Sequence, residues 1–297
     1  MNKIRNEIFK GAATALITPF KEGKIDFEAF ENLIEKQIES GISALVVCGT
    51  TGEASTMDYN EQLACIKFTV DKAGGRVPVI AGTGSNCTKK AIYLSRSAQE
   101  LGADALLVIT PYYNKATPDG LISHFTAIAD SVDAPIILYN VPSRTGVNIT
   151  IDVYKALAEH KNIAAVKEAS GNISAIASLL SECGEKLSVY SGNDDQTLPL
   201  LALGGSGVIS VTSNVMPREM QELCEHFFKG NIDSARQIQL RLMDMINTMF
   251  CEVNPIPVKY AMSLMNLCSP ELRLPLTVPN DKSKAKIRST LTRYNLI

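Results

Sequence analysis

One lysine of the chain stands where its side chain could act as a nucleophile. Lys167 follows an apolar run, residues 163–166, that predicts a buried strand. An amine at the end of such a strand is desolvated, which lowers its pKa and favours the neutral form. A neutral amine attacks carbonyl carbons, so Lys167 is a candidate for covalent catalysis. The alternative is a structural lysine in an ion pair with Glu53, Glu168 or Asp194.

A lysine nucleophile also needs a group that moves protons while its adduct forms and breaks. Tyr139 ends the neighbouring apolar run, residues 135–138. A tyrosine with its ordinary pKa of about 10 is a poor base. It would therefore need hydrogen-bonded hydroxyls as a relay, and Thr50, Thr51 and Tyr113 are suitable types. The alternative is a core tyrosine whose hydroxyl donates to a backbone carbonyl.

Two segments could bind carboxylates beside this amine. Arg144 lies in a turn between Pro142 and Gly146, which suits a guanidinium aimed at a carboxylate. The amides of residues 49–52, at an expected helix start, could hold a second anion. Two anion sites beside an amine indicate an acid substrate, and a solvated loop arginine is the alternative for Arg144. The glycines of residues 204–207 are only a weak phosphate signal, because they precede an expected strand.

These candidate residues follow short apolar runs that predict parallel strands. Eight such runs occur, and the segments between them have the apolar spacing of helices. Their near-continuous apolar character is typical of strands covered on both faces. In the first unit, Asp26 is placed to cap the helix and Gly41 to end it. The runs are residues 13–17, 44–48, 77–81, 105–109, 135–139, 163–167, 187–191 and 207–211.

Eight βα units in about 215 residues predict an α/β fold, the (β/α)8 TIM barrel. No early Gly-x-Gly-x-x-Gly motif favours an open, doubly wound sheet instead. The pattern is helical after the eighth strand, so we expect a barrel over residues 1–216 and a C-terminal helical region over residues 217–297. The active site of a barrel lies at the carboxyl ends of its strands, which would bring the candidate residues together.

Composition argues against several classes of function. The chain has 297 residues, 29 Lys and Arg against 31 Asp and Glu, and a net charge of −2. Without a basic run, nucleic acid and anionic membrane surfaces are not expected partners. Seven cysteines without CxxC spacing and three scattered histidines argue against a disulfide scaffold and a zinc site. We see no signal peptide and no membrane-spanning stretch, and we expect a cytoplasmic protein.

Six motifs lie in a fixed order along the chain. They are residues 49–53 (Gly-Thr-Thr-Gly-Glu), 110–113 (Thr-Pro-Tyr-Tyr), 139–146 (Tyr-Asn-Val-Pro-Ser-Arg-Thr-Gly), 166–169 (Val-Lys-Glu-Ala), 204–210 (Gly-Gly-Ser-Gly-Val-Ile-Ser) and 254–259 (Asn-Pro-Ile-Pro-Val-Lys). In order and spacing they resemble the dihydrodipicolinate synthase family, part of the pyruvate-dependent class I aldolase superfamily that includes N-acetylneuraminate lyase. The resemblance covers nearly the whole chain.

The resemblance implies a lyase that uses no metal and no organic cofactor, because the iminium on the lysine is the electron sink. Lys167 would form a Schiff base with pyruvate, and the enamine would attack L-aspartate 4-semialdehyde to give 4-hydroxy-tetrahydrodipicolinate, in lysine and diaminopimelate biosynthesis. Tyr139, Thr50 and Tyr113 would relay protons, with Tyr113 lent by a neighbouring subunit. The implied substrate contacts are Thr51 and Arg144 on the two carboxylates and the backbones of Gly192 and Ile209.

Two sequence features distinguish the synthase from related activities of the superfamily. Arg144 and the double threonine favour the synthase over sugar-acid lyases, whose turn resembles Pro-Ala-Leu-Ser-Gly and whose loop reads Gly-Ser-Thr-Gly-Glu. Another pyruvate aldolase remains an alternative, because changes in a few loops redirect a shared mechanism. A catalytically silent barrel that acts as a binding protein is a third, but it would predict loss of the lysine or the tyrosine relay. By resemblance we expect a homo-oligomer, a tetramer built as a dimer of dimers.

One family site departs from its pattern in this chain. Lysine-inhibited relatives have an allosteric site at a subunit interface, which falls here at Ala54, Ser55, Tyr59, Gln62, Asn86, Lys90 and Tyr112. Asn86 and Tyr112 match the family. Tyr59 and Gln62 replace two histidines, and Lys90 replaces an acidic residue. Because the Lys90 ammonium would repel an incoming lysine, we expect an enzyme that is insensitive to lysine feedback.

Overall fold

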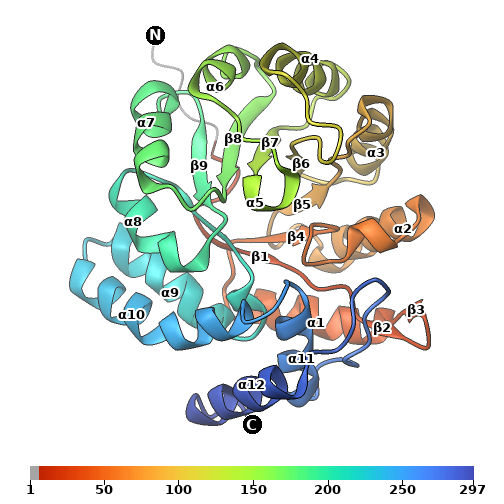
Figure 1. Cartoon of the computed structure of the whole chain (residues 1–297), viewed down its shortest axis with the longest axis vertical. Helices are drawn as coiled ribbons and strands as arrows, with labels where there is room; N and C mark the ends of the chain where they lie inside the picture. The colour runs from red at the N-terminus through yellow and green to blue at the C-terminus, as the bar shows by residue number, and fades with distance from the viewer. Residues whose placement is uncertain (1–6) are drawn as a thin grey trace.

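The computed structural model describes residues 7–297 and shows a closed barrel of eight parallel strands (Figure 1). β1 pairs with β10 on one side and with β4 on the other, which closes the barrel. The predicted (β/α)8 TIM barrel is confirmed, and each strand overlaps one of the predicted runs. The strands are β1 (Gly11–Ala15), β4 (Ala44–Val47), β5 (Val79–Gly82), β6 (Ala105–Ile109), β7 (Ile136–Asn140), β8 (Ile163–Glu168), β9 (Ser188–Ser191) and β10 (Gly207–Ser210).

Helices surround the strands and cover the outer face of the barrel. The first of them begins as predicted, because the Asp26 carboxylate accepts a hydrogen bond from the Ala29 amide at 3.0 Å. Such a bond satisfies one of the free amides at a helix start. The ring consists of α1 (Phe27–Glu39), α2 (Tyr59–Ala73), α3 (Thr88–Glu100), α4 (Pro118–Ala129), α6 (Ile151–Leu157), α7 (Ile173–Cys183), α8 (Thr197–Ala202) and α9 (Pro217–Phe228).

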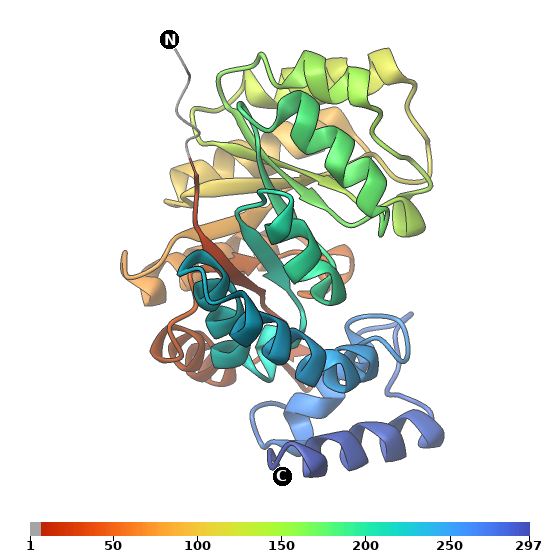
Figure 2. The same cartoon turned by 90° about the vertical axis from the view of Figure 1, so that its left-hand side faces the viewer.

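α9 packs against β1 and follows β10, so it takes the eighth position of the ring. The expected division after residue 216 therefore falls inside the eighth βα unit. The chain continues with α10 (Ile232–Met249), α11 (Ile256–Leu264) and α12 (Asp281–Arg293), and Figure 2 shows α12 at one edge of the molecule. Within residues 7–297, no helix combines the length and the apolar character that crossing a bilayer needs.

Short elements at the ends of the strands complete the fold. β2 (Phe20–Lys21) and β3 (Lys24–Ile25) form a small antiparallel hairpin after β1. A helical turn, α5 (Pro142–Thr145), follows β7. Three 3-10 helices follow β4, β9 and β10, namely η1 (Ala54–Thr56), η2 (Asp194–Gln196) and η3 (Thr212–Asn214). These turns lie at the carboxyl ends of their strands, where the candidate residues are.

The barrel interior is filled from its amino end. Small side chains such as Ala13 and Ala165 cluster there with Ile137 and Tyr190. Phe9 stacks on the Tyr190 ring with centroids 4.1 Å apart, and the Tyr190 hydroxyl donates to the Phe9 carbonyl at 2.8 Å. These contacts fill the middle of the barrel, and a cavity of about 440 Å3 lined by Pro78, Asp104 and Asn162 lies outside them at the amino ends of the strands.

The glycines before β10 allow close packing. An ideal Cβ on Gly207 would lie 1.9 Å from the Gly11 carbonyl oxygen, and one on Gly205 would lie 1.9 Å from Leu200 Cδ2. No side chain fits at such distances. The stretch lies at the amino end of β10, opposite to the candidate site, which gives the phosphate interpretation no support.

Candidate active site

Lys167 lies near the carboxyl end of β8, beside Tyr139 on β7. The two residues are paired neighbours in the sheet, and Lys167 Nζ lies 4.4 Å from the centroid of the Tyr139 ring. Only 6% of Lys167 is exposed, and every residue of β7 is buried. The apolar strands therefore carry the amine and the phenol together into a setting that excludes most water.

The amine of Lys167 has no carboxylate in an ion pair with it in the described part of the chain. Burial lowers its pKa to about 8, with Asp194 opposing this shift and Arg144 adding to it. Desolvation destabilises the ammonium form, and the charge of Asp194 offsets this effect only in part. The neutral amine is therefore well populated near pH 8.

The three carboxylates considered as partners for Lys167 are bound elsewhere. Glu53 forms its ion pair with Lys259. Glu168 accepts hydrogen bonds from the Tyr154 hydroxyl and the Asn140 side chain, both at 3.0 Å. Asp194 Oδ2 accepts from the Thr212 amide at 2.8 Å and from the Thr212 hydroxyl at 2.7 Å. The structural alternative for Lys167 does not fit these contacts.

Tyr139 and Thr50 line the same cavity, and the Thr50 side chain interacts with the Tyr139 phenol. Burial raises the pKa of Tyr139, while Arg144 and the Thr50 side chain act against this rise. The phenol therefore stays protonated at neutral pH. A protonated phenol does not remove a proton on its own, but it can accept one proton while it donates another along a hydrogen bond. The pair is therefore suited to a relay.

Asn254 connects two of the candidate substrate-binding residues. Its Nδ2 donates to Thr51 Oγ1 at 3.0 Å, and its carbonyl accepts from Arg144 Nη2 at 3.3 Å. Asn254 Oδ1 is buried and has no hydrogen-bond partner among the described residues. The sequence analysis noted the motif at residues 254–259 but assigned no role to Asn254. Only the folded chain shows that it meets residues more than 100 positions earlier.

Gly192 directly follows β9 and lies close to the Lys167 side chain, and Ile209 lies on β10. An ideal Cβ on Gly192 would lie 3.1 Å from Lys167 Cε and 2.6 Å from Ala169 Cβ, so a side chain there would displace its neighbours. Ile209 on β10 is fully buried in the apolar cluster that also contains Tyr139. The close approach of Gly192 therefore restricts the space beside Lys167.

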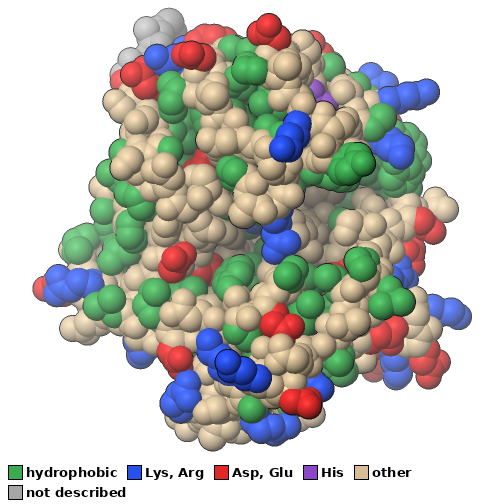
Figure 3. All heavy atoms as spheres, viewed as in Figure 1, with side chains coloured by type: hydrophobic (Ala, Val, Ile, Leu, Met, Phe, Trp, Pro, Cys, Tyr) green, Lys and Arg blue, Asp and Glu red, His purple; other side chains and the backbone are tan. Residues whose placement is uncertain are grey.

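A cavity of about 440 Å3 opens beside this group and is lined by Thr50, Tyr139 and Arg144. Figure 3 shows the molecule hollowed near the middle of the face in view, with Lys and Arg side chains at the edge of the hollow. The same cavity is lined by all seven residues that the resemblance assigned to a degenerate allosteric site: Ala54, Ser55, Tyr59, Gln62, Asn86, Lys90 and Tyr112. Tyr113 does not line this cavity, and 92% of the residue is exposed.

The arrangement can perform carbonyl chemistry on an acid. A partly neutral amine can add to a keto carbon, and the phenol and hydroxyl beside it can move the protons that dehydration requires. Arg144 at the cavity carries a guanidinium that can bind a carboxylate, and Thr51, in the turn after β4, is buried and does not line the cavity. These groups need no metal to form a Schiff base.

Comparisons with known proteins agree on one group. Residues 8–294 match the model of the dihydrodipicolinate synthetase family. The chain is 50% identical over 290 residues to the 4-hydroxy-tetrahydrodipicolinate synthase of Pelobacter propionicus, covering 98% of this chain and 100% of that one. The crystal structure of dihydrodipicolinate synthase from Aquifex aeolicus has a TM-score of 0.95 at 48% identity, covering 97% and 99% of the two chains. That of the Cyanidioschyzon merolae enzyme with lysine bound has a TM-score of 0.94 at 39% identity, covering 98% and 100%.

We expect the nucleophilicity of Lys167 to rise with pH through about 8. Below that pH the amine is protonated and cannot attack a carbonyl, and above it the amine is neutral. Reductive methylation with formaldehyde and cyanoborohydride, followed at the Lys167 peptide by mass spectrometry, should reach half of its plateau rate near pH 8. Lys155 is the control, because its hydrogen bond with Glu182 raises its pKa above 10.5. Identical pH profiles for the two lysines would contradict the shift.

Proposed function

The chain belongs to the dihydrodipicolinate synthetase family and is a lyase, and on this premise we propose that it condenses pyruvate with L-aspartate 4-semialdehyde to give 4-hydroxy-tetrahydrodipicolinate. This reaction would place it in lysine and diaminopimelate biosynthesis. The observation that carries the proposal is the buried Lys167 amine, which has a pKa of about 8 and lies 4.4 Å from the Tyr139 ring. A Schiff-base mechanism requires such an amine.

In the first half of the reaction, the Lys167 amine attacks the keto carbon of pyruvate. The carbinolamine loses water to give an iminium, and loss of a methyl proton gives the enamine. Each step moves one proton, and Tyr139 with Thr50 is placed to accept or return it. Because the site is desolvated, few water molecules compete with this relay.

In the second half, the enamine carbon attacks the aldehyde carbon of the semialdehyde and a carbon–carbon bond forms. The amino group of the bound semialdehyde then attacks the iminium carbon, and the Lys167 amine leaves as the ring closes. Arg144, exposed at the cavity, would hold the carboxylate of the semialdehyde, and Thr51 would hold that of pyruvate. The backbones of Gly192 and Ile209 would shape the space around the adduct.

Borohydride should trap pyruvate on Lys167, because reduction converts the iminium into a stable secondary amine. We expect Lys167→Ala to lose both the adduct and turnover in a coupled assay with pyruvate and aspartate semialdehyde. Tyr139→Phe is the matched control, which should keep the adduct but lower turnover by about 100-fold, since it removes only the relay hydroxyl. Trapping at another lysine, or a parent protein without synthase turnover, would refute the proposed function.

We also propose that Tyr113 completes the relay of a neighbouring subunit in a homo-oligomer, a tetramer built as a dimer of dimers. Tyr113 is 92% exposed and adopts a left-handed backbone conformation, with φ of 71°. A phenol held in that way outside its own cavity is placed to enter the site of another copy. Such backbone conformations are costly for residues with side chains and occur often at functional sites.

Mixing two inactive variants tests the sharing of Tyr113. Lys167→Ala and Tyr113→Phe subunits, after exchange, should regain about a quarter of parent activity, because half of the dimers are mixed and each has one complete site. If Tyr113 acted within its own subunit, no combination would contain a complete site and mixing would restore nothing. Sedimentation of each variant alone controls for loss of assembly.

We further propose that lysine does not inhibit this enzyme. The Gln62 amide is occupied, because Nε2 donates to the Ala54 carbonyl at 2.9 Å and to the Met57 carbonyl at 3.0 Å. Lys90 is exposed at the cavity and forms no ion pair among residues 7–297. The cavity therefore presents an unneutralised cation where a second ammonium would enter, and like charges repel.

Steady-state rates with added L-lysine should equal the rates without it. Lys90→Glu should bring in a response, because the substitution replaces the repelling ammonium with an attracting carboxylate. Isothermal titration of both proteins with lysine gives the same comparison without turnover. Strong inhibition of the parent enzyme would contradict the proposal.

A further inference from the structure

A buried ion pair joins the C-terminal helical region to the turn after β4. Lys259 on α11 contacts Glu53 Oε1, and both side chains are completely buried. The other carboxylate oxygen, Glu53 Oε2, accepts from the Arg273 amide at 3.1 Å. Glu53 is thus bound through both oxygens to residues 206 and 220 positions later in the chain.

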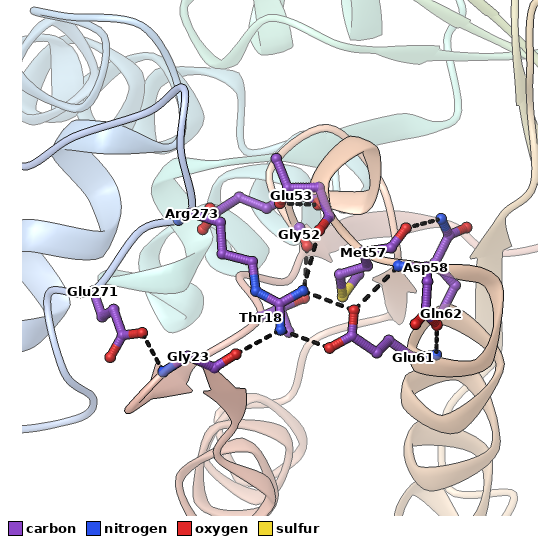
Figure 4. A network of polar contacts seen from close by, with 11 residues as sticks. Thr18, Gly23, Gly52, Glu53, Met57, Asp58, Glu61, Gln62, Glu271 and Arg273 are labelled. Carbon is purple, nitrogen blue, oxygen red and sulfur yellow. Dashed lines mark hydrogen bonds and ion pairs between the residues drawn. The ribbon is translucent and has the colours of Figure 1, made fainter.

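Arg273 also binds the other end of the segment that begins at Glu53, residues 53–61 (Figure 4). Its guanidinium donates to both carboxylate oxygens of Glu61, at 2.6 and 2.7 Å, and to the Thr56 carbonyl at 3.1 Å. Lys259 Nζ and the Arg273 guanidinium carbon lie 4.2 and 4.3 Å from the centroid of the Phe20 ring. The segment from residue 53 to 61 is therefore held at both ends by the C-terminal region.

Glu53 lies directly after the two threonines of the proposed site. It adopts a left-handed conformation, with φ of 54°, and the chain leaves the Thr50–Thr51 turn through it. The turn is also held from two other sides, because Thr18 Oγ1 donates to the Gly52 carbonyl at 2.7 Å and Asn254 to Thr51. Neither Glu53 nor Lys259 lines the cavity, so they touch no substrate there.

Stability alone does not explain this ion pair. Removing two charges from water costs more than their attraction returns in many proteins, and apolar pairs of similar size often serve as well. A buried pair of this kind fixes one geometry, because any displacement leaves a charge buried without its partner. The geometry fixed here is that of the Thr50–Thr51 turn.

We propose that Glu53 and Lys259 are positioning residues, whose ion pair sets the turn so that Thr50 meets the Tyr139 hydroxyl and Thr51 faces the substrate carboxylate. The inference rests on the proposed function, because it assigns those tasks to the two threonines. It extends that function by making the C-terminal helical region a working part of the active site.

The double variant Glu53→Gln with Lys259→Met tests the proposal on the full-length enzyme. It removes both charges while keeping most of the volume, and the glutamine oxygen can still accept from the Arg273 amide. We expect an unfolding temperature close to that of the parent, a turnover number lower by about 10- to 100-fold and a higher KM for pyruvate, since small misplacements of reacting groups cost rates of this order. The matched control is Lys155→Met with Glu182→Gln, which removes an exposed ion pair of 2.6 Å between α6 and α7 and should change neither constant.

The outcomes separate this inference from the proposed function. A parent enzyme that makes no pyruvate adduct refutes the function. An active parent with a folded double variant of unchanged turnover number and KM overturns the positioning role. A double variant that does not fold overturns it as well, because the pair would then hold the whole fold rather than the turn. Loss of turnover with retained folding, in the double variant but not in the control, supports it.

Discussion

The site depends on burying the Lys167 amine away from water without a carboxylate of the described residues in an ion pair with it. A pKa of about 8 against an ordinary 10.5 means that burial shifts the balance between the charged and neutral forms of Lys167 toward the neutral form by about 3 kcal/mol, compared with the same amine in water. The fold meets that cost through the many apolar contacts of a closed barrel, whose strands are buried along almost their entire length. Everything else in the site follows from this constraint. A relay phenol must lie against the amine, and the carboxylates of the chain must be turned elsewhere.

The local pattern of apolar residues predicted the strands and helices of this fold well. It predicted less well how they assemble. Near-continuous apolar runs located all eight strands, because burial on both faces leaves few polar positions to confuse the pattern. The runs differ from the observed strands by one or two residues at their ends, where pairing with neighbours decides. The division after residue 216 separated α9 from the barrel because an eighth ring helix and a C-terminal extension have the same amphipathic pattern. The β2–β3 hairpin has strands of two residues, too short for any periodicity.

The candidate site was predictable where it lies at strand ends and hidden where it depends on distant segments. The positions of Lys167 and Tyr139 follow from the strand pattern, since parallel strands of a barrel share one edge. Asn254 and Lys259 reach the site from the C-terminal helical region, more than 200 positions after the turn that they contact. No local pattern contains such a contact. The sequence analysis named Glu53 as a possible partner of Lys167, and in the structure Glu53 pairs with Lys259.

Two buried lysines in one chain show how a partner decides what an amine can do. Lys259 is completely buried against Glu53; burial lowers the pKa of Lys259, and the charge and hydrogen bond of that carboxylate oppose the shift and so act in favour of the ammonium form. Lys167 is almost as deeply buried but extends from a strand end whose neighbouring carboxylate, Glu168, is bound by Tyr154 and Asn140. Burial alone would make either amine neutral and reactive. By turning Glu53 toward the C-terminal region and Glu168 toward Tyr154 and Asn140, the fold leaves the Lys167 amine without an ion-pair partner among residues 7–297.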